Sequence, residues 1–167
     1  MSKVIVICGA TATGKSDIAI EIARELGAEI INADSMQLYR GMDIGTAKLS
    51  MQERGGIPHH LLDVLDVSED STVAWYQEKA RAAITEIHGR GKDAVIVGGT
   101  GLYIKAILDD LNFPDTDPEV RAKLETELAE FGAAALFTRL EELDPAAALA
   151  IDRANTRRVI RALEVIE

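Results

Sequence analysis

The sequence predicts an α/β fold, with a parallel sheet flanked by helices and an all-helical insertion at the C-terminal end of the chain. Over residues 1–112, short β-branched runs alternate with helical patterns, as is typical of βαβ units. A glycine-rich segment joins the first strand to the first helix. Helical patterns continue after Asn112, where we find no strand candidate. We therefore expect an incomplete α/β core over residues 1–112, and a helical insertion with its return helix over residues 113–167.

The composition is that of a folded domain. Hydrophobic residues make up 47% of the 167 residues, which argues against disorder. The net charge of −10 argues against a broadly basic surface for nucleic acids. The single cysteine, Cys8, excludes an internal disulfide framework and a cysteine-based zinc site. No apolar run approaches the roughly 20 residues of a membrane span, so we expect no membrane segment. The composition as a whole predicts a soluble, cytoplasmic protein, and we expect it to be a monomer.

The first strand, helix and second strand follow one another closely. Residues 3–8 form a β-branched run that is too short for a helix and suits a buried strand. From Lys15, apolar residues recur at helical spacing until Gly27 ends the pattern. A second short strand is predicted over residues 29–32. The segment 33–48 has turn-forming residues but no clear period, which predicts a loop with at most a helical turn.

The signals for the remaining elements of the core differ in strength. Ser50 and Glu53 have the spacing of a capping box, which predicts a short helix that ends at Gly55. A short strand is expected within residues 59–67. A strong helical stripe covers residues 72–88, followed by a third apolar strand over 94–97 and another helix over 102–108.

The last third of the sequence predicts three or four helices between Pro118 and Glu167. Asp117 and Asp144 are good N-caps, each followed by proline at the first helical position. The final periodic run is still continuing at Glu167, and the core offers only three firm strands where sheets usually have roughly four to six. These two observations predict a chain cut short, with part of its core supplied by residues outside it.

A phosphate-binding motif lies between the first strand and the first helix. Residues 9–16 fit the pattern G-x-x-x-x-G-K-[ST], the P-loop. The glycines let backbone N–H groups turn toward phosphate oxygens, and the helix adds its positive N-terminus. Lys15 supplies a positive charge, and the Ser16 hydroxyl can bind Mg²⁺. The motif therefore predicts a ligand with a diphosphate group; a glycine-rich turn that binds nothing is the alternative.

The acidic residues decide which chemistry fits this loop. P-loop hydrolases place a Mg²⁺-binding aspartate at the end of a second apolar strand, but the strand over 94–97 ends in Gly-Gly-Thr-Gly. Asp63 and Asp66 are weaker candidates for that role. Asp34 directly follows the strand over 29–32, so it is expected in the same crevice as Lys15. It could bind metal or accept a proton from a nucleophile, or it could simply end the strand in an Asx turn.

Two further groups carry charge or metal-binding atoms. Arg153, Arg157, Arg158 and Arg161 are predicted to form a positive patch at helical spacing. The alternative is a solvated arginine face paired with Glu164 and Glu167. His59 and His60 are neighbours on an extended chain and point in opposite directions, which favours a structural or hydrogen-bonding role over metal binding.

Six sequence blocks, in this order, resemble the tRNA dimethylallyltransferase family, the bacterial tRNA isopentenyltransferase type. They are Gly-Ala-Thr-Ala-Thr-Gly-Lys-Ser at 9–16, Asp-Ser-Met-Gln-Leu-Tyr at 34–39, Gly-Thr-Ala-Lys at 45–48, His-His-Leu at 59–61, Gly-Gly-Thr-Gly-Leu-Tyr at 98–103 and Arg-Arg-Val-Ile-Arg-Ala-Leu-Glu at 157–164. The family usually has proline where Ala10 stands. Its members continue well past the last block, so the chain resembles a member that lacks the C-terminal part.

The resemblance implies transfer of a dimethylallyl group from dimethylallyl diphosphate to N6 of adenosine 37 in tRNA. It implies that Asp34, Thr13 and Lys15 are catalytic, with Asp34 as general base, and that Mg²⁺ contacts Ser16. Diphosphate binding is implied for Gly9, Ala10, Thr11, Ala12, Thr13, Gly14, Lys15 and Ser16. Binding of the tRNA anticodon stem-loop by the helical insertion and the core is implied for Asp34, Ser35, Met36, Gln37, Thr100, Arg121, Arg157, Arg158 and Arg161.

Three alternatives stay open from the sequence alone. A P-loop kinase of small molecules would share the loop and an acidic residue near the second strand. An adenylate isopentenyltransferase shares the P-loop but fits the helical insertion poorly. A truncated chain that binds diphosphate or RNA without catalysis is the non-enzymatic alternative.

Overall fold

The computed structural model describes residues 2–114 and 117–167. Within these ranges the chain forms two compact units, residues 1–112 and residues 113–167. None of the described helices combines the length and the apolar character needed to cross a membrane.

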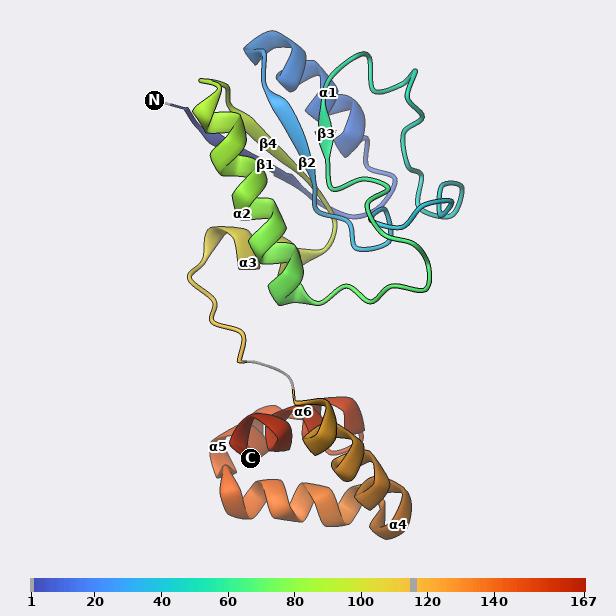
Figure 1. Ribbon diagram of the computed structural model, residues 1–167, viewed down its shortest axis with the longest axis vertical. Helices are drawn as coiled ribbons and strands as arrows, with labels where there is room; N and C mark the ends of the chain where they lie inside the picture. Colours follow the sequence, from blue (N-terminus) through green and yellow to red (C-terminus); the bar gives the residue numbers. More distant parts are fainter. Residues whose placement is uncertain (1, 115–116) are drawn as a thin grey trace. The chain divides into compact units, whose positions relative to one another are not determined.

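The first unit is built on a four-stranded sheet whose strands are all parallel (Figure 1). Its order is β1-β4-β2-β3, so the strand predicted over 94–97 lies between the two earlier ones. The bounds are β1 Val4–Cys8, β2 Glu29–Asn32, β3 His59–His60 and β4 Ala94–Gly98. The α/β fold, the three firm strands and the short strand expected within 59–67 are thereby confirmed.

Helices cover both faces of this sheet (Figure 1). α1 (Lys15–Leu26) packs on one face, while α2 (Val73–Gly89) and α3 (Gly101–Leu108) pack on the other. Neighbouring strand residues point to opposite faces, so Ile30 lies in the core beneath α1 and Ile31 in the core beneath α2 and α3. Three of the four helices predicted for the unit are confirmed. This layering leaves the carboxyl ends of β1, β2 and β4 at one edge.

The short helix predicted after Ser50 is wrong, because residues 51–56 form turns. Part of the capping pattern is present: Ser50 N–H donates to Glu53 Oε2 at 2.8 Å, and Glu53 N–H lies 3.4 Å from Ser50 Oγ. Gly55 and Gly56 follow with φ of 59° and 77°, a left-handed backbone that ends the turn before a helix can propagate.

The second unit is helical, as predicted. It contains α4 (Pro118–Leu143), α5 (Pro145–Ala150) and α6 (Thr156–Ile166). Asp117 and Asp144 act as N-caps, with side chains that accept from Glu119 N at 2.9 Å and from Ala147 N at 2.9 Å. Gly132, at φ 83° and ψ 166°, breaks α4 into two parts, so either count of three or four helices fits. The parts fold back on each other and share a buried core with α6 that includes Leu124, Leu136, Leu140, Val159 and Leu163.

Candidate functional site

The P-loop forms a concave backbone segment between β1 and α1. Ala12 and Gly14 have φ of 62° and 76°, so left-handed residues alternate with others and turn successive N–H groups to one side. For alanine this conformation costs about 1–2 kcal/mol, a strain that is typical of ligand-binding loops. No side chain caps the first turn of α1. The N–H groups at the start of that helix are therefore available to an anion.

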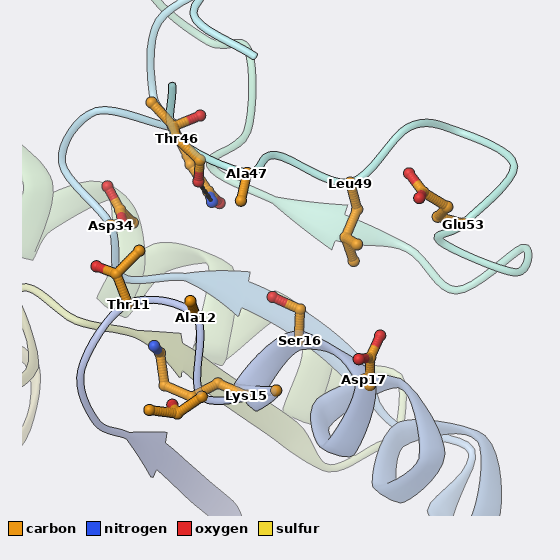
Figure 2. A pocket seen from close by; sticks show the side chains of 13 residues that line it. Thr11, Ala12, Lys15, Ser16, Asp17, Asp34, Thr46, Ala47, Leu49 and Glu53 are labelled. Carbon is orange, nitrogen blue, oxygen red and sulfur yellow. Dashed lines mark hydrogen bonds between the residues drawn. The ribbon is translucent and has the colours of Figure 1, made fainter. Parts of the chain in front are cut away.

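Two side chains of the loop hold its ends together. Thr13 Oγ1 donates to the Ala10 carbonyl at 2.9 Å, and the Lys15 ammonium donates to the same carbonyl oxygen. Figure 2 shows the Lys15 ammonium close to the backbone at Thr11 and Ala12. The lysine thus contributes its charge within the concave segment.

Asp34 lies across the same cleft from Lys15. A cavity of about 310 Å³ is lined by the P-loop residues 11–16 and by Asp34 and Gln37, with the segment 46–53 along its outer side (Figure 2). The Asp34 carboxylate accepts the Met36 N–H at 2.9 Å. The cleft therefore combines a P-loop backbone that suits an anion with a carboxylate that can accept a proton.

The Gly-Gly-Thr-Gly segment, which begins with the last residue of β4, packs against the backbone just before Asp34. A Cβ on Gly98 would lie 2.2 Å from the Ala33 carbonyl carbon, so only glycine allows the two chains this close. Ala33 N–H donates to the Val97 carbonyl at 2.7 Å, and Thr100 N–H donates to the Ala33 carbonyl at 3.1 Å. The Thr100 hydroxyl accepts the Ser35 N–H at 3.1 Å. In this structure Thr100 supports the loop that carries Asp34 and Ser35.

The loop after Asp34 folds over the cleft and is fixed by a buried lysine. Gln37 Nε2 donates to the Thr46 carbonyl at 2.9 Å. The Lys48 side chain is only 2% exposed and lies 2.8 Å from Asp43 and 2.6 Å from Asp63. Burial alone would lower the pKa of Lys48, but hydrogen bonds to these two carboxylates outweigh it and raise the pKa. Lys48 therefore stays charged and ties the loop to the segment after β3.

The two weaker metal candidates are engaged in ion pairs. Asp63 contacts Lys48 and also lies 3.1 Å from Arg54, and Asp66 lies 2.9 Å from Arg40. Burial alone would raise the pKa of Asp63, but the hydrogen bonds from Lys48 and Arg54 outweigh it and lower the pKa. Among residues 2–114 and 117–167, no cluster of three or more His, Cys, Asp or Glu side chains could hold a metal ion.

The neighbouring histidines His59 and His60 have hydrogen-bonding roles, as the sequence predicts. His59 Nδ1 lies 2.8 Å from the Ile57 carbonyl, and His60 Nε2 lies 2.7 Å from Glu29 Oε2. Glu29 is buried at the start of β2, at the opposite end of that strand from Asp34, where it also meets Arg90 and Lys92. Burial alone would raise the pKa of Glu29, but hydrogen bonds from Arg90, His60 and Lys92 outweigh it and lower the pKa to about 2.

The predicted arginine row in the second unit is partly wrong. Arg153 precedes Asn155, the N-cap of α6, so it does not continue the helical row of Arg157 and Arg161. Its guanidinium lies over the Phe137 ring, 4.8 Å from the centroid, and 3.6 Å from Glu141. Arg157 and Arg158 lie in the first turn of α6 and are exposed.

Arg121 and Arg161 are held by a buried carboxylate. Glu164 lies 3.0 Å from each guanidinium, and it also accepts the Asp117 N–H at 3.1 Å. Burial alone would raise the pKa of Glu164, but hydrogen bonds from the two arginines outweigh it and lower the pKa. Arg161 also donates to the Pro114 carbonyl at 2.6 Å. The alternative that the arginines pair with Glu164 and Glu167 therefore holds for Arg161, which pairs with Glu164. Glu167 pairs instead with Arg139, which is outside the predicted row.

Sequence comparison relates the chain to one family. The family described as "IPP transferase" matches residues 37–167. A tRNA dimethylallyltransferase of Thermobifida fusca is 59% identical over 172 residues, which cover 100% of this chain and 54% of that protein. The same enzyme of Parafrankia sp. is 58% identical and is covered to 52%. The chain thus spans about half the length of the curated relatives it matches.

Solved structures of two enzymes share the fold. A tRNA isopentenylpyrophosphate transferase of Bacillus halodurans is 48% identical, with a TM-score of 0.67 over 99% of this chain and 55% of that one. A eukaryotic dimethylallyltransferase acting on tRNA is 34% identical, with a TM-score of 0.85 over 99% of this chain and 41% of that one.

Proposed function

The chain belongs to the IPP transferase family, and on that premise we propose that it transfers a dimethylallyl group from dimethylallyl diphosphate to N6 of adenosine 37 in tRNA. The observation that carries the proposal is the single cleft lined by both the P-loop and Asp34. A diphosphate held at one wall and a proton acceptor at the other suit a displacement in which diphosphate leaves and an amine attacks. Action on tRNA also implies a cytoplasmic location.

In this proposal the P-loop binds the leaving group. The open N–H groups of residues 12–16 and the start of α1 surround the diphosphate. Lys15 moves from the Ala10 carbonyl to the diphosphate oxygens and stabilises the charge that develops on them. Thr13, whose hydroxyl donates to the Ala10 carbonyl and which also lines the cleft, would contact the diphosphate.

The transfer itself is one displacement. The lone pair of the adenine N6 attacks C1 of the allyl group, the C1–O bond breaks, and pyrophosphate leaves with the bonding electrons. The N6 proton passes to the Asp34 carboxylate, which acts as general base. Proton transfer of this kind typically contributes about 10²–10⁴-fold to the rate.

The donor set suits a Mg²⁺ ion that is bound mainly by the diphosphate. Mg²⁺ keeps several waters and takes only one or two protein ligands in phosphate sites. The Ser16 hydroxyl lines the cleft at the start of α1 and would be that ligand. Bound there, the ion would neutralise charge on the leaving group.

The tRNA must present its adenine outside the base stack. Unstacking costs about a few kcal/mol and exposes N6 to the cleft. Ser35, Met36 and Gln37 lie beside Asp34 and would line the base, with Thr100 below them. Arg157 and Arg158 would contact phosphates of the anticodon stem-loop, together with Arg121 and Arg161, which Glu164 pre-orients.

A transfer assay tests the proposal. The protein is incubated with labelled dimethylallyl diphosphate and an anticodon stem-loop RNA, with a stem-loop that carries guanosine at position 37 as control. We expect label in the adenosine RNA alone. Thermal protection by ATP–Mg²⁺ but not by dimethylallyl diphosphate would favour a kinase, and binding of both substrates without transfer would favour the non-catalytic alternative.

A further inference from the structure

One buried amide side chain contacts the backbone of Asp34 on both sides. Asn32, the last residue of β2, is only 3% exposed. Its Oδ1 accepts the Asp34 N–H at 3.0 Å, and its Nδ2 donates to the Asp34 carbonyl at 2.9 Å. The two backbone polar groups of Asp34 are thus both bound by the same side chain.

Asn32 is itself fixed by the core. The hydroxyl of Tyr76, a fully buried residue, donates to the backbone carbonyl of Asn32 at 2.7 Å. The Tyr76 ring stacks on Tyr103 at a centroid distance of 3.8 Å. Asn32 Nδ2 also donates to the carbonyl of Leu61, whose φ of 59° is a strained conformation that its surroundings must maintain. Asn32 is therefore held to the core through its backbone carbonyl, while its side-chain amide binds two irregular segments, one of which carries Asp34.

We propose that Asn32 is a positioning residue that holds the Asp34 carboxylate toward the P-loop cleft. This inference rests on the proposed function, in which Asp34 accepts the proton of N6. With its N–H and carbonyl both bound, Asp34 has little backbone freedom, and the Met36 N–H contact selects one side-chain orientation. A general base must lie within hydrogen-bond reach of its proton, and a displacement of about 1 Å can lower the rate about 100-fold.

The variant Asn32→Ala tests the role through the kinetic constants. We expect kcat for transfer to fall about 100-fold, with KM for dimethylallyl diphosphate and Kd for inorganic pyrophosphate unchanged. Asn32→Ser should recover part of kcat, because its hydroxyl can accept the Asp34 N–H. Gln77→Ala is the matched control: Gln77 also donates to two carbonyls, those of Ala106 and Leu111, but lies outside the cleft. It should leave kcat unchanged.

A double variant separates positioning from general loss of structure. If Asn32 acts through Asp34, adding Asn32→Ala to Asp34→Asn should cause no further loss of kcat. Losses that multiply in the double variant would overturn the proposal, as would a fall in pyrophosphate affinity equal to the fall in kcat.

Hydrogen exchange provides a readout that does not depend on activity. The Met36 N–H donates to Asp34 Oδ1, so its protection reports the position of the carboxylate. We expect exchange at Met36 about tenfold faster in Asn32→Ala and unchanged in Gln77→Ala. Unchanged exchange in Asn32→Ala would overturn the positioning role. Absence of transfer by the unaltered protein would contradict the proposed function alone, since the exchange result still decides the role of Asn32.

Discussion

Glu29 and Asp34 are carboxylates near opposite ends of the same strand, β2, and their surroundings differ. Glu29 is buried and lies within ion-pair distance of Arg90, Lys92 and His60. Asp34 faces an open cleft and accepts a backbone N–H from Met36. The charge of Glu29 is neutralised within the fold, whereas Asp34 is available to a ligand. We infer that the carboxylate at the amino end of β2 contributes to stability, whereas the one at the carboxyl end is placed for the chemistry that we propose.

Asp34→Asn should give the largest effect at the carboxyl end. The amide keeps the shape and the acceptor for Met36 N–H but cannot take a proton. We expect transfer to fall about 10²–10⁴-fold while pyrophosphate binding and the unfolding free energy stay nearly unchanged. Single-turnover transfer and calorimetric titration with pyrophosphate measure the two quantities. Transfer at a near-normal rate would remove Asp34 from its role.

Gly98→Ala tests whether close packing of the strand ends is required there. The new methyl group would lie 2.2 Å from the Ala33 backbone, so the chains must separate. We expect a loss of about 1–3 kcal/mol in the unfolding free energy, measured by urea denaturation. Gly101→Ala is the control, because a Cβ there meets nothing within 4 Å. Equal stability of the two variants would contradict the account.

Glu29→Gln tests the amino end through pH. The folded pKa of Glu29, about 2, is lower than the ordinary value of 4.5, so its stabilising contribution is present above pH 4.5 and is lost as pH falls toward 2. We expect the variant to lose about 2 kcal/mol at pH 7, allowing for half-exposed partners, and to show a flatter fall in stability between pH 5 and 2. Its pyrophosphate affinity should match that of the unaltered protein. An identical acid-unfolding curve would count against the role of Glu29.

Two arginines of the helical unit should differ in the same way, one affecting RNA binding alone and the other also affecting stability, with smaller effects. Arg157→Ala should weaken anticodon stem-loop binding and reduce the salt dependence of log K by about one unit, without a change in stability. Arg121→Ala should lower stability as well, because it leaves Glu164 with one cation fewer. Binding measured at several salt concentrations, with thermal unfolding alongside, distinguishes the two. A stability loss in Arg157→Ala of the same size would contradict the distinction.

The features that depend on local sequence could be predicted. The P-loop follows from eight consecutive residues, and Asp34 from its place just after a strand, because parallel strands end at one edge. The α/β fold follows from the spacing of apolar residues along the chain. The N-caps Asp117 and Asp144 follow from residue type, because aspartate is one of the residues preferred at the start of a helix.

The features that depend on contacts between residues far apart in the chain could not be predicted from the sequence. Asn32 reads as the end of a strand, and its role arises only because Tyr76, Leu61 and Asp34 meet it in space. Gly98 reads as a strand terminator until Ala33 is placed against it. The helix expected after Ser50 does not form, because two glycines in the left-handed conformation, Gly55 and Gly56, end the turn that Ser50 and Glu53 begin. Arg153 does not share a helix face with Arg157 and Arg161, because α6 begins only after its N-cap, Asn155.

A crystal structure with bound pyrophosphate would show whether the P-loop and Asp34 face one ligand in one cleft. We expect pyrophosphate on the N–H groups of residues 12–16, the Lys15 ammonium moved from the Ala10 carbonyl to the ligand, and the Asp34 carboxylate facing it across the cleft. Pyrophosphate bound outside the loop, or Asp34 turned away from the bound ligand, would contradict it.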